Sequence, residues 1–185
     1  EQACSLLETA SQGPDSVLSA RAVDQLIALP TPGLVRARQL AAEDRIDEAW
    51  ELYVSVWNAV NAAEIDMELG YLTLRRLSRL VEEEDLGSIR EAVATEAGAA
   101  LQEQAKALFA AVAGRPHRRL AQAARIELGY RLLDEGDQEG ASELFWLARD
   151  GPDSALERRA RVAQGFLAIE RLELDEAAAV LDSAA

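Results

Sequence analysis

Apolar residues recur three or four positions apart along most of the chain, which is the spacing of one helix face and not of a strand. Turns rich in proline and glycine interrupt this pattern near residues 13–15, 30–33, 114–116 and 151–153. The pattern predicts an all-α protein with helices at about 2–12, 15–28, 33–43, 45–62, 64–84, 89–113, 116–135, 138–150, 154–171 and 174–184.

Several predicted helices begin with residues that can satisfy free backbone N–H groups. Ser88 with Glu91, and Ser154 with Glu157, have the spacing of a capping box. Asp44 and Asp137 each precede a predicted helix and are expected to act as N-caps.

A regular spacing of small and large residues is clearest in residues 122–151. Gly129 and Leu132 lie in one predicted helix, Gly136 in the turn, and Ala141 and Phe145 in the next helix. A small residue at a helix crossing lets two axes approach closely, and the large residue fills the groove beside it. We therefore expect a bulky residue at Gly129 or Ala141 to disrupt the packing.

Two further segments follow the same spacing. In residues 156–185 the matching residues are Gly165, Ala168, Ala177 and Leu181, and Leu172 replaces the turn glycine. Near the N-terminus they are Ala37, Leu40, Ala49 and Tyr53, with Asp44 in the turn. Leu69-Gly70-Tyr71 begins a fourth, degenerate copy between residues 64 and 113.

This spacing resembles the tetratricopeptide repeat, a family of helical hairpins about 34 residues long. The resemblance implies a right-handed α-α superhelix of three to four hairpins. It divides the chain into an N-terminal helical cap (1–30) and repeats (31–185, clearest at 122–151 and 156–185) that we expect to continue beyond the C-terminus.

Charge and composition narrow the classes of partner. The 185 residues carry a formal net charge of −14, which disfavours nucleic acid and anionic membranes at long range. We expect no membrane insertion, because no stretch approaches the roughly 18 uninterrupted apolar residues of a spanning helix. Cys4 and His117 are the only residues of their kinds, so neither an internal disulfide nor a Cys/His zinc cluster can form. The sequence does not distinguish a cytoplasmic location from a periplasmic or cell-envelope one.

Residues that would support catalysis are sparse. Lys106, the only lysine, lies in a predicted helix without a glycine-rich phosphate loop, and the sequence contains no G-x-S-x-G nucleophile motif. We predict that the protein is not an enzyme and uses no cofactor or metal. The carboxylates at 82–85 and 134–139 are expected to face water.

Arginines concentrate at the start of two predicted helices, at positions 115, 118, 119, 125, 158, 159 and 161. One interpretation is that nearby glutamates pair with them on a solvated surface. The other is a clamp in which guanidinium groups bind the carboxylates of an acidic tail.

Aromatic residues follow the small residue of three first helices: Tyr71, Tyr130 and Phe166. The family resemblance implies that this position faces the concave surface, where these rings would bind a partner with Ile126, Asp134, Arg159 and Glu170 as neighbours. The alternative is that the rings pack against the next hairpin. Trp50, Trp57 and Trp146 are expected to be buried between helices, although Phe145 and Trp146 are adjacent, so one of those two must point away from the core.

These observations favour a non-catalytic scaffold that binds a partner peptide or helix on its concave face. An alternative is the regulatory or sensor region of a larger bacterial protein, such as a transcription regulator, and a third is a small-molecule pocket within a closed bundle. The last predicted helix has apolar residues at 179–181 with no following helix to cover them, which predicts further repeats or self-association.

Overall fold

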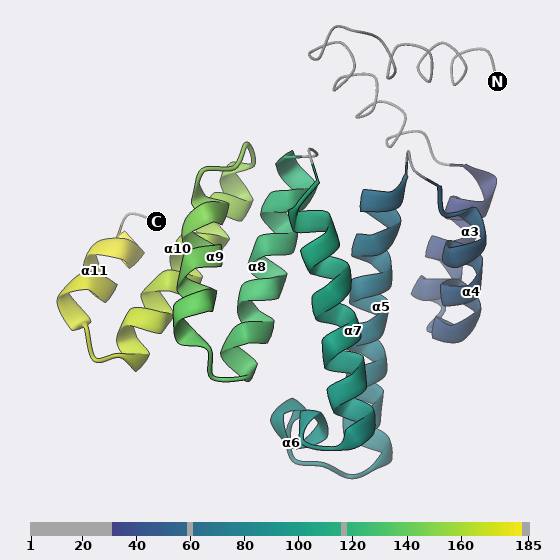
Figure 1. The fold of residues 1–185 in the computed structure, drawn as a ribbon, viewed down its shortest axis with the longest axis horizontal. Helices are drawn as coiled ribbons and strands as arrows, with labels where there is room; N and C mark the ends of the chain where they lie inside the picture. Colours follow the sequence, from purple (N-terminus) through teal and green to yellow (C-terminus); the bar gives the residue numbers. More distant parts are fainter. Residues whose placement is uncertain (1–30, 59–60, 116–117, 183–185) are drawn as a thin grey trace, which may run out of the picture. The chain divides into compact units, whose positions relative to one another are not determined.

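The computed structural model describes residues 31–58, 61–115 and 118–182, which form nine helices and no strand (Figure 1). This confirms the all-α prediction. The predicted cap 1–30 and its two helices lie outside the described residues, as do Cys4 and His117. The helices are α3 (Pro32–Ala42), α4 (Ile46–Val56), α5 (Ala62–Glu83), α6 (Ile89–Val93), α7 (Glu96–Ala113), α8 (Arg118–Asp134), α9 (Gln138–Arg149), α10 (Ser154–Glu170) and α11 (Leu174–Asp182).

The chain forms two compact units, Glu1–Leu101 (unit 1) and Gln102–Ala185 (unit 2), with the division inside α7. In unit 1, α3 packs on α4, α4 on α5, and α6 on α5. In unit 2, each of the helices α8 to α11 packs on the next one, and α10 also contacts α8 (Figure 1). Each unit is therefore built from consecutive antiparallel helices, as tight turns between amphipathic helices require.

The predicted small and large residues lie where two helices of a hairpin cross. A Cβ added to Gly129 would stand 2.6 Å from Cε1 of Phe145, and one added to Gly165 would stand 2.6 Å from Cδ2 of Leu181. Phe145 is completely buried. In α3 and α4, Ala37 and Tyr53 have the same separation of sixteen residues and are also completely buried. The α8–α9 and α10–α11 hairpins thus share one packing rule, in which a missing side chain admits a large one, and the α3–α4 hairpin buries a small and a large residue at the same spacing.

The turns after α3, α5, α8 and α10 also share one geometry. Each contains a residue in the left-handed region: Asp44, Asp85, Gly136 and Leu172, with φ of 62°, 52°, 85° and 62°. In each turn the amide of the following residue donates to the carbonyl five residues earlier, as from Asp137 N to Leu132 O at 2.9 Å and from Glu173 N to Ala168 O at 2.9 Å. These bonds define the Schellman ending of a helix.

Two predicted helices end earlier than expected. The predicted helix 89–113 is interrupted after α6, because the Thr95 hydroxyl bonds the Ala92 carbonyl at 2.7 Å and accepts the Gly98 amide at 3.0 Å, which starts α7 anew. Gly98 is required there, since an added Cβ would lie 1.9 Å from Ala92 O. The predicted helix 45–62 ends at Val56.

The predicted N-caps are right in two of four cases. Ser88 accepts the Glu91 amide at 3.2 Å, and Asp137 accepts the Gly140 amide at 2.9 Å. The Ser154 prediction is wrong by one residue, because Asp153 is the N-cap of α10 and accepts the amides of Ala155 and Leu156. The prediction for Asp44 is also wrong: its left-handed backbone turns the carboxylate toward Arg75 and Arg79 of α5.

The tryptophans are less buried than the sequence predicts. Of the adjacent aromatic pair, Phe145 is buried and Trp146 is 56% exposed, so Trp146 is the member that points outward. Trp57 is 47% exposed, contrary to expectation, because α4 ends before it; its indole N–H donates to Asp66 at 3.0 Å. Trp50 is half-buried, and the Arg76 guanidinium lies 4.6 Å from its ring centre.

The crossing at Gly129 predicts an unusual result for a helical glycine. Gly129→Ala should lower the free energy of unfolding by about 1–3 kcal/mol, because the buried Phe145 ring cannot yield space easily. Helical glycine to alanine normally has the opposite sign. Gly114→Ala is the control, since its added Cβ would meet only ordinary contacts at 3.7 Å and 4.0 Å. Urea unfolding followed by circular dichroism measures both, and equal effects would contradict the packing rule.

The turn after α10 predicts a stabilising substitution. Leu172 is 82% exposed, so little burial is lost on replacing it, whereas its left-handed backbone favours glycine. Leu172→Gly should raise the free energy of unfolding by about 0.5 kcal/mol after the greater freedom of glycine in the unfolded chain is deducted. Leu172→Ala keeps a Cβ and should give no gain in the same unfolding measurement. A gain of equal size for alanine would show that the backbone is not the cause.

Candidate functional site

One face of α8 and α10 brings several of the predicted partner-binding residues onto neighbouring helices. Positions one or two turns apart along α8 place Ala123, Glu127, Tyr130 and Asp134 on one side of that helix, and the same spacing in α10 gives Arg159, Ala163, Phe166 and Glu170. We call these eight residues the first-helix face; Glu127 and Ala163 are buried within it, and the other six are at least partly exposed. Since α10 packs on α8, the two rows belong to one continuous part of unit 2.

Tyr130 is held in place from both sides. Its ring meets the Phe145 ring edge to face, with ring centres 5.2 Å apart. The guanidinium of Arg159 lies 5.4 Å from the centre of the Tyr130 ring and bonds Glu127 at 2.8 Å. Burial opposes the charge of Arg159, but Glu127 outweighs this effect and raises the pKa of Arg159. One side of the Tyr130 ring therefore packs on Phe145 within its own hairpin, and Arg159, which is paired with Glu127, lies over the ring.

Phe166 occupies the position in α10 that Tyr130 occupies in α8, yet it is 61% exposed. No described residue covers it as Arg159 covers Tyr130. A large aromatic ring this exposed offers contact area at a low cost in side-chain freedom. Phe166 is thus the apolar residue of the first-helix face that is most open to a partner.

The other predicted site residues fall into different environments. Ile126 is completely buried in the core with Ala141 and Phe145, so its prediction as a partner contact is wrong; it lies on the side of α8 that faces α9. Asp134 is half-buried and pairs with Arg131 at 3.2 Å. Glu170 is exposed at the end of α10. Tyr71 is 38% exposed on α5 in unit 1, whereas the other residues belong to unit 2.

The arginine cluster divides between the two interpretations. Three of its members pair with carboxylates: Arg119 with Asp153 at 2.8 Å, Arg161 with Glu157 at 2.6 Å, and Arg159 with Glu127. Arg118, Arg125 and Arg158 form no ion pair with any carboxylate in the described ranges.

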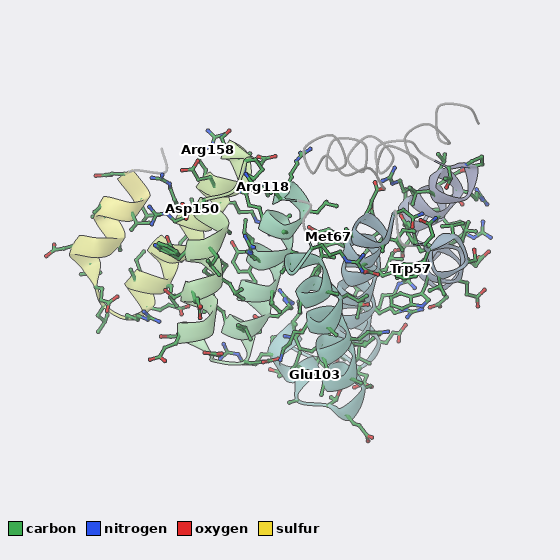
Figure 2. All side chains as sticks on the ribbon, turned by 45° about the horizontal axis from the view of Figure 1, so that its top comes forward. Trp57, Met67, Glu103, Arg118, Asp150 and Arg158 are labelled. Carbon is green, nitrogen blue, oxygen red and sulfur yellow. The ribbon has the colours of Figure 1, made fainter. Side chains whose placement is uncertain are left out.

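A hollow of about 680 Å³ lies at one end of α8, beside the turn between α9 and α10. Figure 2 shows Arg118 and Asp150 toward the same end of the unit 2 helices, with Arg158 nearby. The described residues that line the hollow are Arg115, Arg118, Ala121, Arg125, Asp150, Gly151 and Pro152. Among the described residues that line the hollow, three carry a guanidinium group and one carries a carboxylate.

Gln122, which the sequence did not single out, fastens the turn that forms one wall of this hollow. Its completely buried amide donates to Ala148 O at 2.8 Å and to Asp153 O at 3.1 Å, and accepts the Asp153 amide at 3.0 Å. Gly151 packs directly on it, because an added Cβ would lie 2.0 Å from Cδ of Gln122. The only signal in the sequence was a polar residue on a helix face that is otherwise apolar.

The Asp153 carboxylate adds a charged contact beside this turn. The Leu156 amide, together with that of Ala155 and the charge of Arg119, holds the pKa of Asp153 below its usual value. Asp153 therefore stays ionised and balances the charge of Arg119. The remaining positive charge of this region comes from the arginines that line the hollow.

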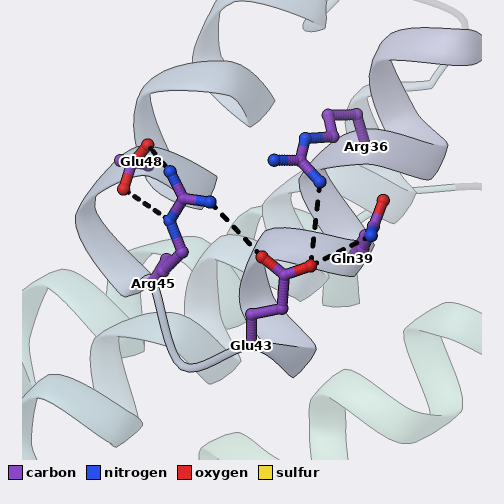
Figure 3. A network of polar contacts seen from close by, with 5 residues as sticks. All are labelled: Arg36, Gln39, Glu43, Arg45 and Glu48. Carbon is purple, nitrogen blue, oxygen red and sulfur yellow. Dashed lines mark hydrogen bonds and ion pairs between the residues drawn. The ribbon is translucent and has the colours of Figure 1, made fainter.

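Unit 1 carries surface networks of a different kind. At the turn between α3 and α4, Glu43 accepts from Gln39 at 3.0 Å and lies near Arg36 and Arg45, and Arg45 also binds Glu48 (Figure 3). All of these groups are exposed, so each pair adds little stability. This network holds the turn and leaves no positive charge unmatched for a ligand.

The described residues offer no arrangement for a metal: nowhere among them do three His, Cys, Asp or Glu side chains converge suitably. Within the same ranges, no helix has the length and apolar character needed to cross a membrane.

Comparisons with known proteins found no match for this chain among family models, curated proteins or solved structures.

The contact of Arg159 with Glu127 and Tyr130 predicts a measurable coupling. Arg159→Ala should lower the free energy of unfolding by about 1 kcal/mol, because it removes an ion pair with a buried carboxylate and a cation–π contact. A double-mutant cycle with Glu127→Gln should recover most of this as coupling energy. Arg158→Ala, next in sequence and without an ion pair to a described carboxylate, should change stability by less than about 0.5 kcal/mol. Additive effects of the Arg159 and Glu127 substitutions would rule out the coupling.

Proposed function

We propose that the protein is a non-catalytic interaction scaffold of tetratricopeptide-like helical hairpins, which binds a peptide or helix of a partner protein on the first-helix face. The observation that carries this proposal is the exposed Phe166 ring. It stands where the preceding hairpin has a covered tyrosine, so a partner segment would occupy the place that Arg159 takes over Tyr130.

The surroundings of Phe166 support a protein partner. Arg159 and Glu170 flank it along α10, so an apolar contact would be bordered by groups of both charges. Interfaces between proteins commonly have this anatomy, with an aromatic anchor and a polar rim. The packing of α10 on α8 supports it as well, because it brings the first helices of two successive hairpins next to each other.

Site-specific crosslinking tests the proposal. A photoreactive phenylalanine analogue placed at Phe166 should crosslink a discrete partner in extracts of the native host, since the ring would be in contact with it. Affinity capture with the Phe166→Ala variant should then recover that partner at least about tenfold less well than the wild-type chain, the loss expected for an aromatic anchor. Circular dichroism should show both chains equally helical.

Trp146 provides the matched control. It is a large aromatic residue of similar exposure, 56%, but it lies on α9, the second helix of its hairpin. Trp146→Ala should leave capture of the same partner unchanged. If Trp146→Ala abolishes capture and Phe166→Ala does not, the first-helix face is the wrong surface.

A further inference from the structure

We propose that the hollow lined by Arg115, Arg118 and Arg125 is a binding site for a short acidic peptide segment, separate from the first-helix face. Its described lining comes from Arg115, from the first part of α8 and from the turn between α9 and α10, and none of these residues belongs to that face. The site thus adds a second contact, of defined chemistry, to unit 2.

Charge is the first argument. The chain carries a net charge of −14, so positive groups gathered in one hollow stand out against the rest of the surface. Arg118 and Arg125 pair with no carboxylate of the described part of the chain. The nearest bond of Arg125 is a long one, 3.5 Å from Nη1 to the Leu147 carbonyl. Guanidinium groups offer forked donors that suit carboxylates, and two or three of them suit a run of such groups.

Rigidity is the second argument. The wall formed by residues 150–152 is fixed from behind by the three hydrogen bonds of the buried Gln122 and by the absence of a side chain at Gly151. Helix α8 carries Gln122, Arg118 and Arg125, so the wall and two of the three positive groups are positioned by the same element. A preformed site of this kind loses little freedom on binding.

Size and net charge select a peptide over other anions. A hollow of about 680 Å³ has the volume of a site for several side chains. Nucleic acid would be repelled by the strongly negative chain outside this small region. Asp150, which also lines the hollow, would repel a ligand that fills it uniformly with negative charge, whereas spaced carboxylates of a peptide can approach the arginines and avoid Asp150.

Fluorescence anisotropy with the full chain tests the site. The probe is a short fluorescein-labelled peptide in which Asp and Glu are spaced by Ser and Gly, and its partner probe has Asn and Gln in their place. The acidic probe should bind and lose affinity as salt is added, while the amide probe should not bind. Arg118→Ala with Arg125→Ala should weaken binding of the acidic probe at least about tenfold.

A matched double variant controls for total charge. Arg36→Ala with Arg171→Ala also removes two positive charges, but from exposed sites outside the hollow, and should retain the wild-type affinity for the acidic probe. Equal weakening by both double variants would mean general electrostatic attraction and would overturn the proposal, as would failure of the acidic probe to bind. Displacement of the probe by inorganic phosphate at constant ionic strength would also overturn it, by assigning the hollow to phosphate groups. Because Phe166 plays no part here, this result is independent of the crosslinking experiment.

Discussion

The close approach of paired helices at a small residue is the constraint on which the structure depends. At Gly129 and Gly165 the space of the missing side chain is occupied by a ring or a leucine from the facing helix, and Ala37 and Tyr53 of the α3–α4 hairpin are buried at the same spacing. This contact fixes how the two helices cross, and the crossing decides which sides of them are buried. The crossing therefore determines which side chains of these hairpins remain on the surface of unit 2.

The turns show that geometry persists where residue identity does not. Gly136, Asp44 and Leu172 adopt the same left-handed conformation, although only glycine does so without a steric cost. Packing of the flanking helices supplies what the turn residue lacks. At Asp44 the steric cost of this conformation is partly offset by ion pairs, because the carboxylate points toward Arg75 and Arg79 of α5. One turn geometry thus serves both as a helix ending and as a link between hairpins.

The two candidate surfaces of unit 2 arise from opposite sides of the same helix. Tyr130 belongs to the first-helix face and contacts Arg159 of α10, whereas Arg118 and Arg125 lie beside the turn that Gln122 holds. A fully buried glutamine is unfavourable in a core unless its amide is hydrogen-bonded, and Gln122 bonds Ala148 at the end of α9 and Asp153 after the turn. These bonds hold that turn in a single position, which shapes the hollow.

The sequence by itself determined the helical class, most helix positions and the small and large residues of the three hairpins, because periodicity and side-chain volume are local properties of the chain. It also identified the arginines and Phe166 as candidates. Only the tertiary structure decided that Ile126 is buried, that Arg159 covers Tyr130, and that Gln122 holds the turn beside Arg118 and Arg125. These outcomes depend on which helix packs on which side, and helical spacing alone does not distinguish a face covered by a neighbour from one left open.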